Sequence, residues 1–203
     1  MKLLLLLGIF MLFAPMAVFS AALEQHHQGQ NQLVEAAMQR LKANVRYEPA
    51  YVPLAYPNGD VPANTGVCSD VVIRSYRAIG IDLQQRVHED MKKHFAAYPS
   101  QRIWGLKHPD ANIDHRRVPN LQVFFTRFGK SLPPSHRGSD YHAGDLVTWM
   151  LPGNLPHIGI VVKQHSQDGK RPLIVHNIGA GPALEDILFT YKITGHYRYL
   201  PND

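Results

Sequence analysis

The chain has 203 residues, of which 45% are hydrophobic and 18% are charged, with one cysteine and a formal net charge of +5. A lone cysteine excludes a disulfide-stabilised scaffold, and this apolar fraction excludes a disordered chain and suits a single packed domain. The mildly basic charge, without a tract of Lys and Arg, suits an anionic surface such as a cell wall and argues against a nucleic-acid partner.

The first 22 residues are predicted to be a signal peptide. Lys2 is followed by an apolar run over residues 3–19, and small residues from Ser20 to Ala22 fit a cleavage site. An uncleaved membrane anchor is the alternative, because the run approaches the roughly 17 residues that span a bilayer. We therefore expect an exported protein, periplasmic or secreted, whose mature part (residues 23–203) is a single domain without membrane contact.

The segment after the signal peptide is predicted to form a leader, a helix and a loop. Residues 23–32 are polar and are interpreted as a loose leader. Apolar residues recur at every fourth position from Leu33 to Val45, which indicates one stripe of a helix that ends before Tyr47. The stretch from Tyr47 to Gly66 contains four prolines and two glycines and is interpreted as an extended, ordered loop.

The middle of the chain is predicted to be helical. Apolar residues at helical spacing indicate three helices, over residues 68–79, 83–95 and 121–128. Gly80, Pro99 and Gly129 lie where these helices are expected to stop. The first helix begins at Cys68, which places the thiol in its first turn.

From Gly144 onward the pattern changes from helical to extended. Four short runs rich in β-branched or aromatic residues lie between loops of Gly, Pro, Asn and Asp, at residues 144–149, 157–162, 172–177 and 189–199. Helices followed by antiparallel strands indicate an α+β domain. We expect the N-terminal helices to pack on one side of an antiparallel sheet or small barrel.

Cys68 is the first candidate for chemistry, because oxidising surroundings leave a lone thiol either buried and inert or kept for its reactivity. At the start of a helix, a thiol lies in the positive end of the helix dipole and beside unpaired backbone N–H groups, and both favour the thiolate. The same N–H groups can stabilise an oxyanion. The alternative is a small, buried side chain without a chemical role, since cysteine is among the most often buried residue types.

Two histidines can complete a catalytic arrangement with this cysteine. A cysteine nucleophile needs an imidazole within hydrogen-bond reach, and that imidazole needs a third group to orient it. His157 opens one predicted strand and His176 lies in the next, so adjacent antiparallel strands can bring the two together. In this interpretation His157 acts as general base and acid, and His176 accepts its other ring N–H. Asn177 faces the opposite side of the strand and is the alternative orienting residue.

Four motifs follow one another along the chain: GVCSDVV, GDLVTW, PHIGIVV and IVHNIG. Their order resembles the NlpC-type branch of the papain-like cysteine peptidases, in which a Cys-Ser pair opens a helix and a His begins a later strand. The resemblance covers residues 56–177 and implies a papain-like fold and hydrolysis of amide bonds in peptidoglycan stem peptides. A closer resemblance, over most of the mature chain, is to a family of exported bacterial proteins whose function is uncharacterised.

The NlpC resemblance also implies a role for a tyrosine. Members of that family tend to place a tyrosine upstream of the cysteine, near a Gly-rich turn, where its hydroxyl helps the oxyanion hole. Tyr56 is the matching candidate and Tyr51 its rival. Where the family has a small residue two positions after the cysteine, this chain has Asp70, whose charge suits a helix N-terminus but opposes a thiolate. We interpret Asp70 as a group that binds a substrate ammonium.

Arg116 and Arg117 are the other candidates for substrate binding. They belong to a polar cluster at residues 114–117. The planar guanidinium group suits a carboxylate, so the two arginines can clamp the carboxylates of a substrate. The alternative interpretation is a solvated loop.

These features predict an exported cysteine amidase or endopeptidase without a cofactor or metal, and the resemblance implies that it cleaves an amide bond in peptidoglycan or a related peptide. Three alternatives stay open. The same fold can carry out acyl or amide transfer, or it can serve as a non-catalytic cell-wall binding module. A zinc site is the third, since Cys68, His157 and His176 are chemically allowed ligands.

Overall fold

The structure is a computed structural model that describes residues 14–201. Its helices are α1 (Ala14–Arg40), α2 (Cys68–Ala78), α3 (Leu83–His94), α4 (Ser100–Trp104) and α5 (Val118–Phe128), with 3-10 turns η1 (Phe95–Ala97), η2 (Asp114–Arg116) and η3 (Gly138–Asp140). Its strands are β1 (Arg46–Tyr47), β2 (Thr65–Gly66), β3 (Lys130–Leu132), β4 (Leu146–Leu151), β5 (Leu155–His165), β6 (Pro172–Asn177), β7 (Pro182–Glu185) and β8 (Lys192–Arg198).

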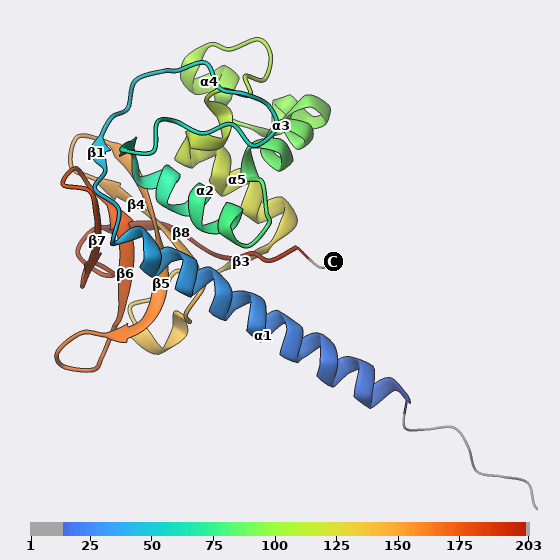
Figure 1. Cartoon of the computed structure of the whole chain (residues 1–203), viewed down its shortest axis with the longest axis vertical. Helices are drawn as coiled ribbons and strands as arrows, with labels where there is room; N and C mark the ends of the chain where they lie inside the picture. The colour runs from blue at the N-terminus through green and yellow to red at the C-terminus, as the bar shows by residue number, and fades with distance from the viewer. Residues whose placement is uncertain (1–13, 202–203) are drawn as a thin grey trace, which may run out of the picture.

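Six of the strands form one antiparallel sheet in the order β3-β8-β4-β5-β6-β7, and β1 and β2 form a separate parallel pair. Within the described residues β3 and β7 are the edges of the large sheet, so it is open and not a closed barrel. Figure 1 shows α2 to α5 gathered on one side of this sheet, while α1 passes beside β5 and extends away from it. The predicted α+β class, with helices packed on an antiparallel sheet, is confirmed.

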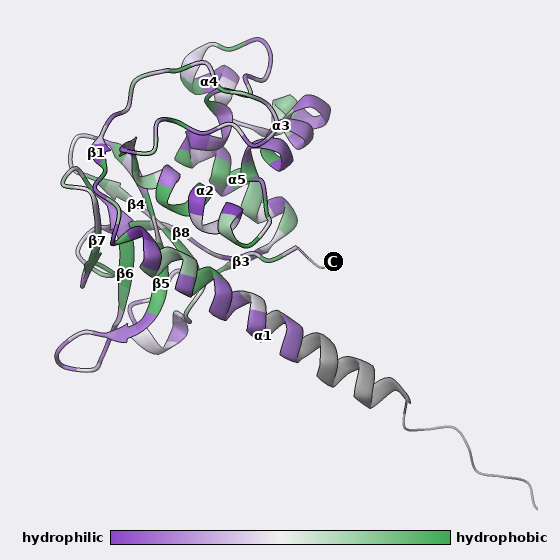
Figure 2. Cartoon of the chain, in the orientation of Figure 1, coloured by the Kyte–Doolittle hydropathy of each residue, from purple (hydrophilic) through white to green (hydrophobic). Residues whose placement is uncertain are grey.

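Alternation along the strands gives the sheet two buried faces. Ile158 and Ile160 of β5 pack with Cys68 and the other buried residues of the helices in the main core. Trp149 of β4 and Val161 of β5 belong to a smaller core on the other face. Successive side chains of a strand point to opposite faces, which explains the division. Figure 2 shows hydrophobic residues concentrated on β5 and β6, in the part of the sheet that both cores share.

The expected leader at residues 23–32 is helical instead, since α1 is continuous. The segment contains no proline, and its one glycine, Gly29, lies against Leu200. Nothing in the segment therefore stops the helix. At the other end, the helix stops at Arg40 and not near Val45, because the N–H of Leu41 turns back to the carbonyl of Met38 in a tighter turn.

The signal-peptide prediction falls partly outside the described residues, since residues 1–13 are not among them. The expected cleavage region from Ser20 to Ala22 lies within α1. Within residues 14–201, no helix has the length and apolarity that a membrane span requires. The boundary between a signal peptide and a single mature domain at residues 22 and 23 stays a prediction.

The remaining predicted elements are present, with shifted ends. The three central helices correspond to α2, α3 and α5, and the four predicted strands to β4, β5, β6 and β8. The third helix begins at Val118, earlier than expected, because Pro119 lies in its first turn, where proline suits a helix start. Five short helices and strands were not predicted, namely α4, β1, β2, β3 and β7, since two to five residues carry too little periodicity.

Gly159→Ala is expected to destabilise the fold. A Cβ at this position of β5 would lie 2.5 Å from Cγ2 of Ile174 and 3.1 Å from Cβ of His176. Overpacking of this kind costs about 1–3 kcal/mol, which urea unfolding measures. Gly169→Ala is the control, since its Cβ meets nothing within 4 Å and only its φ of +69° adds a cost. Unchanged stability of Gly159→Ala would contradict the expected clash with β6.

Candidate active site

Cys68 is the first residue of α2 and lies buried against β5, with 4% of its surface exposed. The helix begins here because Val67 is extended and donates its N–H to Oδ2 of Asp70 at 2.7 Å. This contact is one half of a capping box, which satisfies a backbone donor at the helix start. The N–H of Ile158 on β5 is directed at the sulfur of Cys68. The thiol therefore lies beside the residue that follows His157.

Burial raises the pKa of the Cys68 thiol to about 11, and the negative charge of Asp70 adds to this effect. The backbone N–H groups of Ile158, Ser69 and Cys68 itself act in the opposite direction. The position at a helix start led us to expect a stabilised thiolate. The difference arises because removal from water penalises the charged form more than these N–H groups favour it. In the resting protein the group is a neutral thiol at neutral pH.

The imidazoles of His157 and His176 lie together, as the strand order predicts. Nε2 of His157 is 3.1 Å from Nδ1 of His176, and the two rings stand nearly perpendicular at 88°. Both residues are buried, with 2% and 0% of their surfaces exposed. Trp149, which pairs with His157 across β4 and β5, packs its ring 5.9 Å from the His157 ring. The indole therefore holds His157 in place from one side.

Glu185 continues this arrangement, and the sequence analysis missed it. Its Oε2 lies 2.9 Å from Nε2 of His176. Glu185 comes from β7, where Ala183 pairs with His176 and Glu185 pairs with Ile174. Residues two apart on a strand share a face, so a predicted hairpin after the glycines at 179 and 181 would have placed Glu185 beside His176. The short strand was not predicted, and the carboxylate was missed with it.

Both histidines are neutral at neutral pH. Burial, with a smaller effect from the charge of His176, lowers the pKa of His157 to about 3. Burial also lowers the pKa of His176, against the opposing effect of the Glu185 carboxylate. A neutral imidazole has one lone pair. Because Nε2 of His157 faces His176, Nδ1 is the ring nitrogen of His157 that is left for another partner.

Asp70 and Arg116 were expected to bind a substrate, and the structure pairs them with each other. Nε and Nη2 of Arg116 each donate to one carboxylate oxygen of Asp70 at 2.9 Å. The two residues are 2% and 6% exposed. The carbonyl of Arg116 also accepts from the hydroxyl of Ser69 at 2.7 Å. The pair thus joins the start of α2 to η2, and neither charge faces a solvent-filled space that a substrate can enter.

Arg117 lies nearer the surface than its neighbour. Its guanidinium stacks over the ring of Trp104 at 4.0 Å, and its Nη1 is 3.7 Å from Oδ1 of Asp114. That distance is long for a hydrogen bond, and both atoms are buried without a hydrogen-bond partner. Of the two predicted arginines, Arg116 is held by two hydrogen bonds to a carboxylate, whereas the Arg117–Asp114 contact is too long for one.

The tyrosine beside Cys68 is Tyr47, not Tyr56 or Tyr51. Tyr56 is 44% exposed and packs edge-on against His88 of α3, and Tyr51 donates its hydroxyl to Asp110 at 3.0 Å. Tyr47 pairs with the residue two before the cysteine through β1 and β2. Burial raises the pKa of Tyr47, and the nearby Asp70 carboxylate raises it further, against the opposing effect of the Arg116 cation. Tyr47 lies well before the cysteine in the sequence, and no motif pointed to it as a partner of Cys68.

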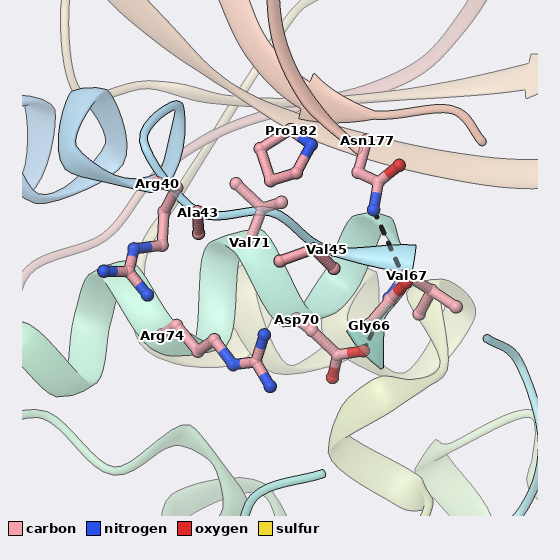
Figure 3. Close-up of a pocket in the computed structure, with 10 residues that line it drawn as sticks. All are labelled: Arg40, Ala43, Val45, Gly66, Val67, Asp70, Val71, Arg74, Asn177 and Pro182. Carbon is pink, nitrogen blue, oxygen red and sulfur yellow. Dashed lines mark hydrogen bonds between the residues drawn. The ribbon is translucent and has the colours of Figure 1, made fainter. Parts of the chain in front are cut away.

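Asn177 faces away from the histidine pair, so His176, and not Asn177, contacts His157. Nδ2 of Asn177 donates to the carbonyl of Gly66 at 3.4 Å, as Figure 3 shows. With Val67 and Asp70 these residues line a cavity of about 10 Å³, which has room for about one water molecule. This side of the α2 start is therefore closed to a substrate.

The zinc alternative requires three ligands around one point. Within residues 14–201, no group of three or more His, Cys, Asp or Glu side chains is arranged to hold a metal ion. Cys68, His157 and His176 therefore do not form a ligand set, and the alternative loses its geometric basis.

Asp70→Asn is expected to destabilise the protein by about 3–5 kcal/mol, because it leaves the buried Arg116 cation without a counter-charge. Urea unfolding measures the loss. Arg137→Ala is the control: its ion pair with Asp140 is on the surface, where the arginine side chain is 78% exposed, and its loss is expected to leave stability unchanged. Equal stability of Asp70→Asn and the unaltered protein would show that the buried pair does not hold the helix start.

Alkylation of Cys68 by iodoacetamide is expected to accelerate about tenfold per pH unit from pH 7 to 10, because the thiolate reacts and its fraction grows below the raised pKa. Asp70→Asn is expected to speed the reaction at a fixed pH, since the charge of Asp70 raises that pKa. Mass spectrometry of the intact protein follows the reaction. A rate that levels off below pH 7 would contradict the neutral resting thiol.

Comparison with known proteins gives a family. Residues 34–199 match the model of a family described as a domain of unknown function, DUF1287. The chain is also similar to the uncharacterised protein YijF of Escherichia coli (strain K12), with 54% identity over 167 residues, which make up 82% of this chain and 80% of the relative. Neither match connects the chain with NlpC-type peptidases. The chain belongs to the DUF1287 family.

Proposed function

We propose that this protein is an exported cysteine amidase or endopeptidase with a papain-like fold, which cleaves an amide bond in peptidoglycan stem peptides through a thioester. One observation carries the proposal: a thiol at the start of a helix lies against the strand that presents the His157–His176 pair. A nucleophile, a base and an orienting group are the parts that such a reaction requires. The substrate class rests on the resemblance to NlpC-type peptidases.

In the proposed mechanism His157 acts first as base and then as acid. Nδ1 of His157 takes the proton of Cys68 as the sulfur attacks the substrate carbonyl, and the electron pair of the C=O bond moves to oxygen. The N–H of Cys68 stabilises this oxyanion, and the hydroxyl of Tyr47 replaces the expected one of Tyr56 as its second donor. Collapse of the intermediate breaks the C–N bond, and His157 gives its proton to the leaving amine. Water then hydrolyses the thioester.

Two alternatives keep the same fold. An amine in place of water would intercept the thioester, and the reaction would be acyl or amide transfer. The raised pKa of Cys68 favours a different alternative, a cell-wall binding module in which the thiol is inert. Product analysis with an added amine acceptor distinguishes the first alternative from hydrolysis, and the experiment below tests the second.

The test is mass spectrometry of purified sacculi after incubation with the mature protein. We expect a new stem-peptide fragment from the unaltered protein and none from Cys68→Ala or His157→Ala, because each variant removes one partner of the proton transfer. His165→Ala is the matched control, since His165 is exposed at the far end of the same strand, and its products are expected to equal those of the unaltered protein. Identical products from all four proteins would overturn the proposed wall hydrolase.

A further inference from the structure

Three side chains form a continuous path from the proposed base to the solvent. His157 contacts His176, and His176 contacts Glu185, through nitrogen–nitrogen and nitrogen–oxygen distances of 3.1 Å and 2.9 Å. The two histidines are fully buried, whereas the side chain of Glu185 is 47% exposed. The path therefore ends on a carboxylate at β7, the edge strand of the sheet.

The chemistry of each group sets the direction of both hydrogen bonds. A carboxylate only accepts, so Nε2 of His176 carries the hydrogen that faces Glu185. A neutral imidazole carries one ring hydrogen, so Nδ1 of His176 is an acceptor. Nε2 of His157 must then donate to it. Nδ1 of His157 is left with the lone pair.

We propose that Glu185 is a positioning residue that fixes the tautomers of His176 and His157 and so keeps the lone pair of His157 Nδ1 available to the Cys68 proton. The inference rests on the proposed function for its catalytic consequence. The tautomers themselves are a property of the resting protein. Without the carboxylate, His176 can carry its hydrogen on Nδ1, which reverses the bond to His157 and places a hydrogen on the nitrogen that has to accept one.

The tautomer assignment also explains how His176 can orient His157 in a buried site that excludes water. The strand partner of His176 is Ala183, whose side chain has no polar atom. The carboxylate of Glu185 is the acceptor that faces Nε2. An orienting histidine without such an acceptor would have two equivalent tautomers and would orient nothing.

The test compares Glu185→Gln with the unaltered protein by ring-nitrogen NMR shifts of the histidines, which distinguish protonated from bare nitrogens and need no substrate. In the unaltered protein we expect hydrogen on Nε2 of both His157 and His176. In Glu185→Gln, whose amide keeps the shape of the side chain but can donate as well as accept, we expect a second tautomer on both rings. Turnover of sacculi is expected to fall about tenfold.

Asp186→Asn is the matched control, because it removes a neighbouring carboxylate that pairs with Arg171 at the surface. We expect it to change neither the tautomers nor the turnover. Hydrogen on Nδ1 of either histidine in the unaltered protein, or tautomers that Glu185→Gln leaves unchanged, would overturn the inference. Expected tautomers in a protein that does not cleave sacculi would instead refute the proposed function and leave the tautomer assignment standing.

Discussion

The buried ion pair between Asp70 and Arg116 is the interaction on which the site depends. Asp70 caps the start of α2 through the N–H of Val67, and both donors of the Arg116 fork hold the carboxylate in that position. Arg116 in turn accepts from Ser69 and donates to the carbonyl of Ala50, so η2 and the long loop close over the same helix start. The place of Cys68 against β5 follows from these contacts.

This arrangement has an electrostatic consequence for the thiol. A carboxylate within the first turn stabilises the helix but raises the pKa of Cys68. The cation of Arg116 pairs with the same carboxylate through two hydrogen bonds. A small residue in place of Asp70 would leave the helix start uncapped and Arg116 without a counter-charge. Asp70 and Arg116 therefore depend on each other.

The elements that could be predicted are those that a local sequence pattern indicates. The periodicity of the central helices and the alternation of β4, β5, β6 and β8 gave the fold class, and the alternation also placed His157 beside His176. Contacts between distant segments carry no such signal. Asp70 and Arg116 are 46 positions apart. From the sequence, each charge was predicted to bind a substrate, whereas in the structure the two charges pair with each other. Glu185 was missed for a related reason, since β7 has only four residues.

Cys68, His157 and His176 are all uncharged in the resting protein, and this determines what the proposed reaction needs. Transfer of a proton from Cys68 to His157 creates two opposite charges in a region that excludes water, where unpaired charges are costly. The anion would meet the N–H groups of Ile158 and Ser69, which already point at the sulfur. The imidazolium would share its charge through His176 with the Glu185 carboxylate. Because both sets of partners are in place before the transfer, they can stabilise the two charges as these form.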